Sequence, residues 1–367
     1  MNDESMFDAD HPLEIADQGC FFVGGRYEGD AAMGRRMRGQ MYVQYQIPRH
    51  RTHPVPIVMI HGGGQTGVNF LGTPDGRRGW ADYFVARGFA VYVIDQPGRG
   101  RAAYAPSYGS SVLRDADTIA GRFTAPERDK RYPQAALHTQ WPGAGEPDDV
   151  DYDQFYASQV PSMDDIGALE AMMREAGAAL LDKIGPAILL THSQGGPLGW
   201  TIADARPRLV RAILAIEPNG APLYEVKFTG EPHWFEDECI GRPWGITRGP
   251  LAFDPPVRNA DELRFERQES ADGPGLVRCW LQSGAPRKLV NLAGIQILIV
   301  TAEASYHAPY DHCTSAFLRQ AGVAHDFVRL PDVGIRGNGH MMMLEKNNLE
   351  IARYLETWVV QRVTAST

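Results

Sequence analysis

Short apolar runs rich in β-branched residues recur along the chain, separated by segments whose apolar residues have helical spacing. Runs of this kind are typical of strands that are buried on both faces of a sheet. The runs are residues 55–60, 90–94, 187–191, 212–216, 295–301 and 326–330, and the helical segments are 80–87, 163–181, 195–205 and 347–360. Because strands alternate with helices, the pattern predicts an α/β protein with a mostly parallel central sheet flanked by helices.

Two regions, 101–160 and 221–293, depart from this alternation. They contain many prolines, glycines and aromatic residues with little periodicity. Such segments predict insertions at the rim of the sheet, forming a cap or lid, rather than domains with their own cores. The core would then comprise 1–100, 161–220 and 294–367. Within the first of these, apolar segments before residue 50 predict antiparallel strands at one edge of the sheet.

Amino-acid composition and charge limit the kinds of molecule that the protein can be expected to bind. Of 367 residues, 43% are hydrophobic and 22% charged, as in soluble globular proteins. The formal net charge is −9 and no basic block is present, which argues against binding nucleic acid or an anionic membrane. The apolar runs are far shorter than the roughly 20 residues of a membrane-spanning helix. A monomer and a homodimer both remain open.

The N-terminus and the cysteines bear on location. The first 18 residues lack a basic region followed by an apolar one, so we expect no signal peptide and a cytoplasmic protein. Cys20, Cys239, Cys279 and Cys313 are far apart and show no zinc-ligand spacing. In that compartment we expect reduced, buried thiols. A bridge between Cys239 and Cys279 is the main alternative.

A candidate nucleophile follows the run at 187–191. The segment reads Thr191-His192-Ser193-Gln194-Gly195, with a helical pattern directly after it. A strand, a serine between small residues and then a helix is the nucleophile elbow of the α/β-hydrolase fold. Thr191 replaces the usual glycine two residues before the serine. The alternative is a serine in an ordinary turn or at a helix N-cap.

An oxyanion hole is predicted where the first buried run ends. His61-Gly62-Gly63-Gly64 follows that run, more than a hundred residues before the elbow, in the order this fold requires. Glycine allows main-chain N–H groups to approach a substrate oxygen closely. We assign the N–H groups of Gly63 and Gln194 as the donors. A flexible glycine turn is the alternative.

The general base is predicted in the loop Gly337-Asn338-Gly339-His340, between the last strand and the last helix. His340 alone among the histidines occupies that late position, from which it can reach the serine. His61 and His192 are interpreted as neighbours that shape the site. His307 and His312 could form a metal pair with Asp311, but their spacing matches no ligand pattern, so we expect no metal site.

The acid of the triad has two candidate positions. Glu217 directly ends the strand at 212–216, where a carboxylate could orient an imidazole. Glu303 and Asp311 occupy the position more usual in this fold. We favour Glu217 and keep the other two open.

With these residues in place, the chain resembles a small group of microbial α/β-hydrolase esterases. The resemblance rests on five segments, 21–25, 73–77, 93–100, 192–194 and 337–343, and runs from about residue 18 to the last helix. It implies a glutamate acid at the position of Glu217. A well-studied member has two adjacent cysteines where this chain has Gly63 and Gly64, and a shorter connection at 221–291.

These features predict a serine hydrolase that cleaves a carboxylic ester or lactone through an acyl-enzyme with a Ser193–His340–Glu217 triad and no cofactor. An amidase or C–C bond hydrolase with the same triad, and a non-catalytic ligand-binding protein of this fold, are the alternatives. Aromatic residues of the insertions could line an apolar pocket for a bulky substrate. The pocket residues expected are His61, Gly64, His192, Trp141, Trp234, Tyr306 and Tyr310, with Tyr156, Phe235 and Trp244 as further aromatic candidates.

Overall fold

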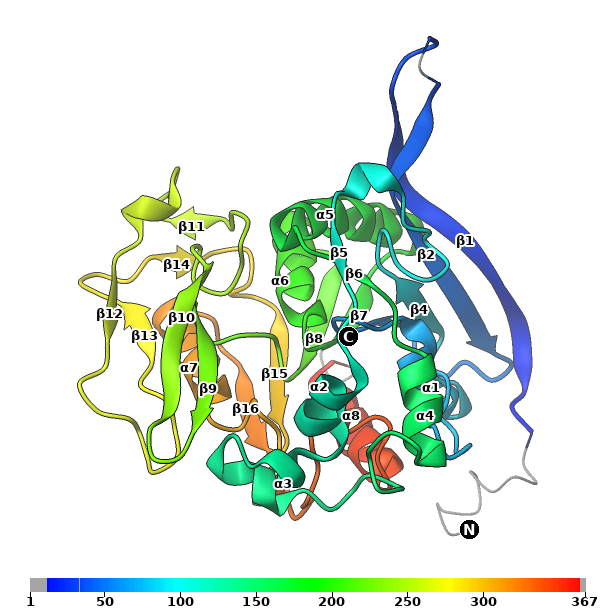
Figure 1. Cartoon of the computed structure of the whole chain (residues 1–367). Helices are drawn as coiled ribbons and strands as arrows, with labels where there is room; N and C mark the ends of the chain where they lie inside the picture. Colours follow the sequence, from blue (N-terminus) through cyan, green and yellow to red (C-terminus); the bar gives the residue numbers. More distant parts are fainter. Residues whose placement is uncertain (1–11, 33, 364–367) are drawn as a thin grey trace.

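An eight-stranded sheet forms the central layer of the protein (Figure 1). The structure is a computed structural model, and it describes residues 12–32 and 34–363. The strands lie in the order β1-β2-β4-β3-β7-β8-β15-β16, antiparallel for the first three and parallel from β4 onward. Their bounds are β1 (Ile15–Glu28), β2 (Arg36–Pro48), β3 (Ile57–Ile60), β4 (Val91–Asp95), β7 (Ala187–His192), β8 (Val210–Ile216), β15 (Gln296–Thr301) and β16 (Asp326–Arg329).

The parallel strands are largely apolar because both faces of the sheet are covered, and their polar residues lie mainly at or near the strand ends. In β7, Ile188 and Leu190 belong to one buried cluster, whereas Ala187 and Leu189 belong to a second cluster on the other face. Side chains of a strand alternate between faces, so a strand between two helix layers is apolar on both faces along most of its length. The fold class predicted from the sequence is confirmed.

Helices pack on both faces of the sheet (Figure 1). The buried residues of α1 (Trp80–Ala86) and α8 (Asn348–Arg362) belong to the first cluster, and those of α5 (Ile166–Ile184) and α6 (Gly195–Ala205) belong largely to the second. A further helix, α7 (Asp311–Gln320), connects β15 to β16. The helix predicted at 163–181 begins later than expected, because the Asp165 side chain caps it by accepting from the N–H of Ala168.

The two predicted insertions contain only short elements. The first includes β5 (Ser111–Val112), α2 (Ala116–Ile119), a π-helical turn (Ala120–Thr124), α3 (Pro126–Asp129) and α4 (Val150–Ala157), and β6 (Ser162–Met163) pairs with β5 just after it. The second holds β9 (Leu223–Gly230), β10 (Trp234–Arg242), β11 (Phe253–Asp254), β12 (Phe265–Arg267), β13 (Trp280–Gln282) and β14 (Lys288–Leu289). Its strands pair as β9–β10, β11–β14 and β12–β13, and Figure 1 shows them grouped beside β15 and β16. Trp141, Phe155 and Phe253 are buried in the clusters that also cover the sheet.

The cysteine prediction was wrong. Cys279 and Cys313 form a disulfide, whereas Cys20 and Cys239 are exposed free thiols. The bridge joins the second insertion to α7 across 34 residues of sequence. This pairing depends on how the insertion folds over α7, and the cysteine spacing alone carries no such information.

Among the described residues, no helix is both apolar enough and long enough to cross a bilayer.

Candidate active site

Ser193 lies on a tight turn between β7 and α6. Its backbone is in the left-handed region, with φ 53°, and its N–H donates to the Ile216 carbonyl at 3.0 Å. A non-glycine residue rarely adopts this conformation, and the surrounding hydrogen bonds must hold it there. The Ser193 carbonyl in turn accepts from the N–H of Asn219 and of Gly196, both at 2.8 Å. The serine is therefore fixed at the carboxyl edge of the sheet.

Glycines behind the turn allow helix and strand to come close. A Cβ at Gly195 would lie 2.6 Å from the Ile60 carbonyl oxygen. A Cβ at Gly199 would lie 2.7 Å from Cγ2 of Thr191, the residue that replaces the usual glycine of the elbow. The absence of a side chain at Gly199, one helical turn after Gly195, makes room for Thr191. The elbow therefore tolerates threonine in place of the usual glycine.

His340 and Glu217 meet beneath the serine. The Nδ1 atom of His340 lies 2.5 Å from Oε2 of Glu217, and both side chains are buried. Glu217 also accepts from the Ala302 N–H at 2.8 Å and from the Ser305 hydroxyl at 2.7 Å. The Glu217 carboxylate thus accepts from three donors. It fixes the orientation of the His340 imidazole ring and favours the tautomer in which Nδ1 carries the proton.

The other two candidate acids have different partners. Glu303 accepts from the side chain of Arg336 at 2.9 Å and from the Gly337 N–H at 2.8 Å. Asp311 lies 2.9 Å from Nδ1 of His307 and accepts from Thr301. Of the three carboxylates considered from the sequence, Glu217 is thus the one in contact with His340.

Burial controls the protonation of this pair. It lowers the pKa of His340 well below its usual value, and the nearby His192, His307 and Arg122 lower it further. Burial also raises the pKa of Glu217, reinforced by the charge of Asp311 and opposed by the hydrogen bonds from Ser305 and Ala302. A neutral imidazole at neutral pH is the form that can accept a proton.

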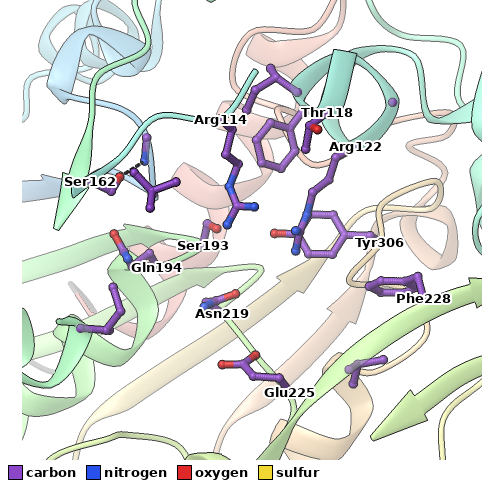
Figure 2. Close-up of a pocket in the computed structure, with 18 of the residues that line it drawn as sticks. Arg114, Thr118, Arg122, Ser162, Ser193, Gln194, Asn219, Glu225, Phe228 and Tyr306 are labelled. Atoms are coloured by element: carbon purple, nitrogen blue, oxygen red, sulfur yellow. Dashed lines mark hydrogen bonds between the residues drawn. The ribbon is translucent and has the colours of Figure 1, made fainter. Parts of the chain in front are cut away.

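Tyr306 lies between the serine and the histidine. Its hydroxyl is 3.3 Å from Nε2 of His340 and also within hydrogen-bonding reach of the Ser193 side chain. Figure 2 shows this hydroxyl directed toward Ser193. From the sequence, Tyr306 was expected only to line the pocket, whereas its position links the two reactive groups.

The glycine loop after β3 faces the elbow. Gly63 and Gln194 both line the cavity in front of Ser193, and no described acceptor takes the main-chain N–H of either residue. The next amide along, that of Gly64, donates to the Ser162 hydroxyl at 2.7 Å. Two free amides directed at one space can receive a developing negative charge on oxygen.

Arg99, which the sequence analysis did not identify as a site residue, holds this loop against the elbow. It is buried, and it donates to the Gly62 carbonyl at 2.8 Å and to the side-chain oxygen of Gln194. Burial lowers the pKa of Arg99 to about 10, which leaves it charged at neutral pH. The sequence signal was an arginine between two glycines, Gly98-Arg99-Gly100, shortly after the end of β4.

Several histidines surround the triad residues. His61 contacts Gly62 and Gln96, and burial together with the charge of Arg99 lowers its pKa to about 3. His192 donates to the His340 carbonyl at 3.0 Å, and burial lowers its pKa to about 3. Both rings are neutral and position the loops that carry reactive groups.

Two groups of side chains have metal-ligand proximity among the described residues. Glu217, His307 and His340 place their ligand atoms within 4.8 Å of one another, as do Cys279, His312 and Cys313. In the first group, the Glu217–His340 hydrogen bond already uses one atom of each residue. In the second, both sulfurs are bonded to each other. The pair of His307 and His312 considered from the sequence does not form, because His312 faces Asp272 instead.

A cavity of about 620 Å³ opens in front of Ser193. Tyr306 and Gly64 line it, as expected, but the other five predicted pocket residues do not. Trp141 packs on Phe155, and Tyr310 lies behind Tyr306. The remaining three are Trp234, at the tip of the β9–β10 hairpin, and His61 and His192, beneath the loops.

The wall of the cavity is more polar than the apolar pocket that the sequence predicted. Phe123, Tyr132 and Phe228 contribute aromatic rings, but charged residues are numerous. They are Arg114, Arg122, Asp129, Arg131, Asp164, Glu225, Lys227, Glu238 and Arg248. The sequence analysis missed them because insertions without periodicity do not indicate which side chains face inward.

Known proteins share this architecture. The chain is 45% identical over 341 residues to the "Probable secreted lipase phiG" of Fungal sp. (strain ATCC 74256), covering 92% of this chain and 88% of that protein. Among solved structures, it is similar to "The Atomic Resolution Structure of a Novel Bacterial Esterase", with 25% identity, a TM-score of 0.61 and coverage of 96% of this chain and 98% of that one. Residues 57–354 match the description "Alpha/beta hydrolase family". The chain therefore belongs to the alpha/beta hydrolase family.

Proposed function

We propose that the protein is a serine hydrolase that cleaves carboxylic esters or lactones through an acyl-enzyme. The observation that carries the proposal is the 2.5 Å contact between His340 and Glu217 beneath the strained turn of Ser193. A base oriented by a buried carboxylate, next to a serine that lines a cavity, is the arrangement that activates a serine nucleophile. The relatives named lipase and esterase support ester hydrolysis as the general reaction.

The first half of the reaction forms the acyl-enzyme. Ser193 attacks the ester carbonyl while Nε2 of His340 accepts the hydroxyl proton, and Glu217 stabilises the imidazolium that results. The N–H groups of Gly63 and Gln194 receive the negative charge on the carbonyl oxygen. His340 then gives its proton to the leaving alcohol, and the ester C–O bond breaks.

The second half releases the acid. A water molecule attacks the acyl carbonyl, His340 accepts one of its protons, and Ser193 leaves as its hydroxyl. The Tyr306 hydroxyl contacts Nε2 of His340 at 3.3 Å, so it must give way to Ser193 when the proton is transferred. The Tyr306 hydroxyl also contacts the Ser193 side chain. It can therefore keep a hydrogen bond to Ser193 when Ser193 takes its place at Nε2 of His340.

We further propose that the protein works in an oxidising compartment. The Cys279–Cys313 disulfide supports this, because such bonds persist mainly outside the cytoplasm. The 45% identical relative carries the word "secreted" in its name. Both observations count against the cytoplasmic location expected from the sequence.

The proposal is tested by hydrolysis of a set of carboxylic esters, lactones and amides. We expect turnover of at least one ester or lactone, with a loss of several orders of magnitude in Ser193→Ala. Ser158→Ala is a matched control, because that hydroxyl bonds only the Phe155 carbonyl at the end of α4. Faster cleavage of amides would favour an amidase, and tight ligand binding without turnover would favour a binding protein of this fold.

A further inference from the structure

Two arginine side chains extend into the cavity beside Ser193. Arg114 precedes α2, and Arg122 lies in the π-helical turn that follows it. Figure 2 shows both guanidinium groups directed into the same space, with Ser193 on one side and Tyr306 on the other. Both belong to the first insertion, so they enter the site from the segment that differs most from the regular core.

These two arginines differ from the other cations of the cavity wall in having no ion-pair partner. Within the described residues, no carboxylate forms a salt bridge with Arg114 or Arg122. The other three cations are paired: Arg131 with Asp129 at 3.7 Å, Lys227 with Glu236 at 3.5 Å and Arg248 with Glu225 at 3.4 Å. Two of the acidic residues in the wall, Asp129 and Glu225, are therefore already paired with cations.

The charge of Glu225 acts on Arg122, but Glu225 is already bound by another arginine. Arg242 lies 2.8 Å from Glu225 and contacts both of its carboxylate oxygens. Arg122 is instead positioned by the Tyr306 ring, whose centroid is 4.2 Å from the guanidinium carbon. The contact with the ring holds the Arg122 guanidinium in place and leaves its N–H groups able to bind an anion.

The two positive charges also oppose each other. Burial, followed by the charge of Arg122, lowers the pKa of Arg114. Two guanidinium groups that face one cavity without a counter-charge repel each other. An anion bound between them would offset this repulsion. A planar carboxylate suits guanidinium donors in particular, because it can accept paired hydrogen bonds.

We propose that Arg114 and Arg122 form an anion subsite, and that the substrate is an ester carrying a second, ionised carboxyl group. This inference rests on the proposed ester hydrolysis and specifies its substrate class. In the reaction, water cleaves the ester C–O bond to give an alcohol, a dicarboxylate and one proton, which is released to solvent. The second carboxylate stays on the two arginines throughout and undergoes no chemical change.

The test compares esters that differ only in that carboxylate. Monoethyl succinate, monoethyl glutarate and monoethyl adipate are assayed against neutral ethyl esters of matched chain length, with kcat/KM as the readout. We expect the wild-type protein to prefer at least one monoester by about tenfold or more, and Arg114→Met or Arg122→Met to reduce that preference by roughly 10- to 100-fold. Added salt should weaken the preference.

Arg131→Met is the matched control, because Arg131 lines the same cavity but is paired with Asp129. Its preference ratio should stay within about threefold of wild type. Arg114→Met is the more decisive of the two variants, since Arg114 is more exposed than Arg122, whose guanidinium carbon lies 4.2 Å from the Tyr306 ring centroid. Equal losses on charged and neutral esters, or no preference in the wild-type protein, would overturn the subsite.

A binding measurement separates this inference from the proposed function. Adipate is titrated calorimetrically into Ser193→Ala and into the same variant with Arg114→Met. Adipate binding that depends on Arg114, without ester turnover by the wild-type protein, would support the subsite and refute the hydrolase. Turnover of neutral esters without adipate binding would support the hydrolase and refute the subsite.

Discussion

Glu217→Gln replaces one carboxylate oxygen by an NH₂ group and removes the negative charge, while the side-chain volume stays nearly the same. In the present structure, Oε1 of Glu217 accepts from the Ala302 N–H, whereas Oε2 accepts from Ser305 and from Nδ1 of His340. A glutamine must keep its carbonyl oxygen toward Ala302, because its NH₂ group would otherwise face another donor. That NH₂ group then faces Nδ1 of His340.

The imidazole responds by changing tautomer. To accept from the glutamine amide, Nδ1 of His340 must lose its proton, and the proton then resides on Nε2. A protonated Nε2 is unable to accept the serine proton. Loss of the correct tautomer in a serine triad costs about 10⁴-fold in kcat, which corresponds to about 5.5 kcal/mol of transition-state stabilisation.

The assay is steady-state hydrolysis of a neutral ester, with thermal unfolding as the check on folding. Glu303→Gln is the matched control, since it makes the same change in a carboxylate that contacts Arg336 and Gly337 rather than His340. We expect the control to stay within about tenfold of wild type. A Glu217→Gln variant that keeps more than about a tenth of the wild-type kcat would refute the reasoning, as would greater damage from Glu303→Gln.

Three further predictions concern pH and stability. Because burial lowers the pKa of His340, kcat/KM should fall only when the pH drops below the usual histidine value of 6.5; a pH profile with its acid limb above that value would contradict this. Cys313→Ser should destabilise the fold by about 4 kcal/mol, from the entropy of a closed loop of 34 residues, while Cys239→Ser, at an exposed free thiol, changes little in denaturant unfolding. His138 lies between Glu127 and Glu345, which together raise its pKa to about 9 despite burial. Its stabilising contribution is therefore full below pH 6.5 and lost as the pH rises through about 9, and unfolding measured from pH 6 to 10 should lose this dependence in His138→Gln.

The strands and helices of the central core could be predicted from the sequence, because the hydrophobic patterns that indicate them are local. Each parallel strand is largely apolar, since helices cover both faces, and the nucleophile, the acid and the glycine loop each follow the end of a strand. Ser193, Glu217 and the loop of Gly63 all follow a strand in this way. The carboxyl ends of parallel strands share one edge of the sheet, so chain order alone was enough to bring these residues together in the prediction.

The contacts made by the two insertions could not be predicted from the sequence, because they join residues that are far apart in the chain and follow no periodic pattern. Cys279 meets Cys313 only through the packing of the second insertion on α7. His138, in the first insertion, contacts Glu345, which also accepts from the Gly339 N–H and so holds the loop of His340. Such contacts leave no spacing signal in either segment. The charged wall of the cavity was missed for the same reason.

The central claim is that His340 and Glu217 activate Ser193 as a nucleophile, and covalent labelling tests it most directly. The purified protein is treated with a fluorophosphonate, which reacts with activated serines, and the modified residue is located by peptide mass mapping. The account predicts one adduct on Ser193, formed far more slowly in Glu217→Gln and absent from Ser193→Ala. An adduct on another serine, or a labelling rate that is unchanged by Glu217→Gln, would contradict it.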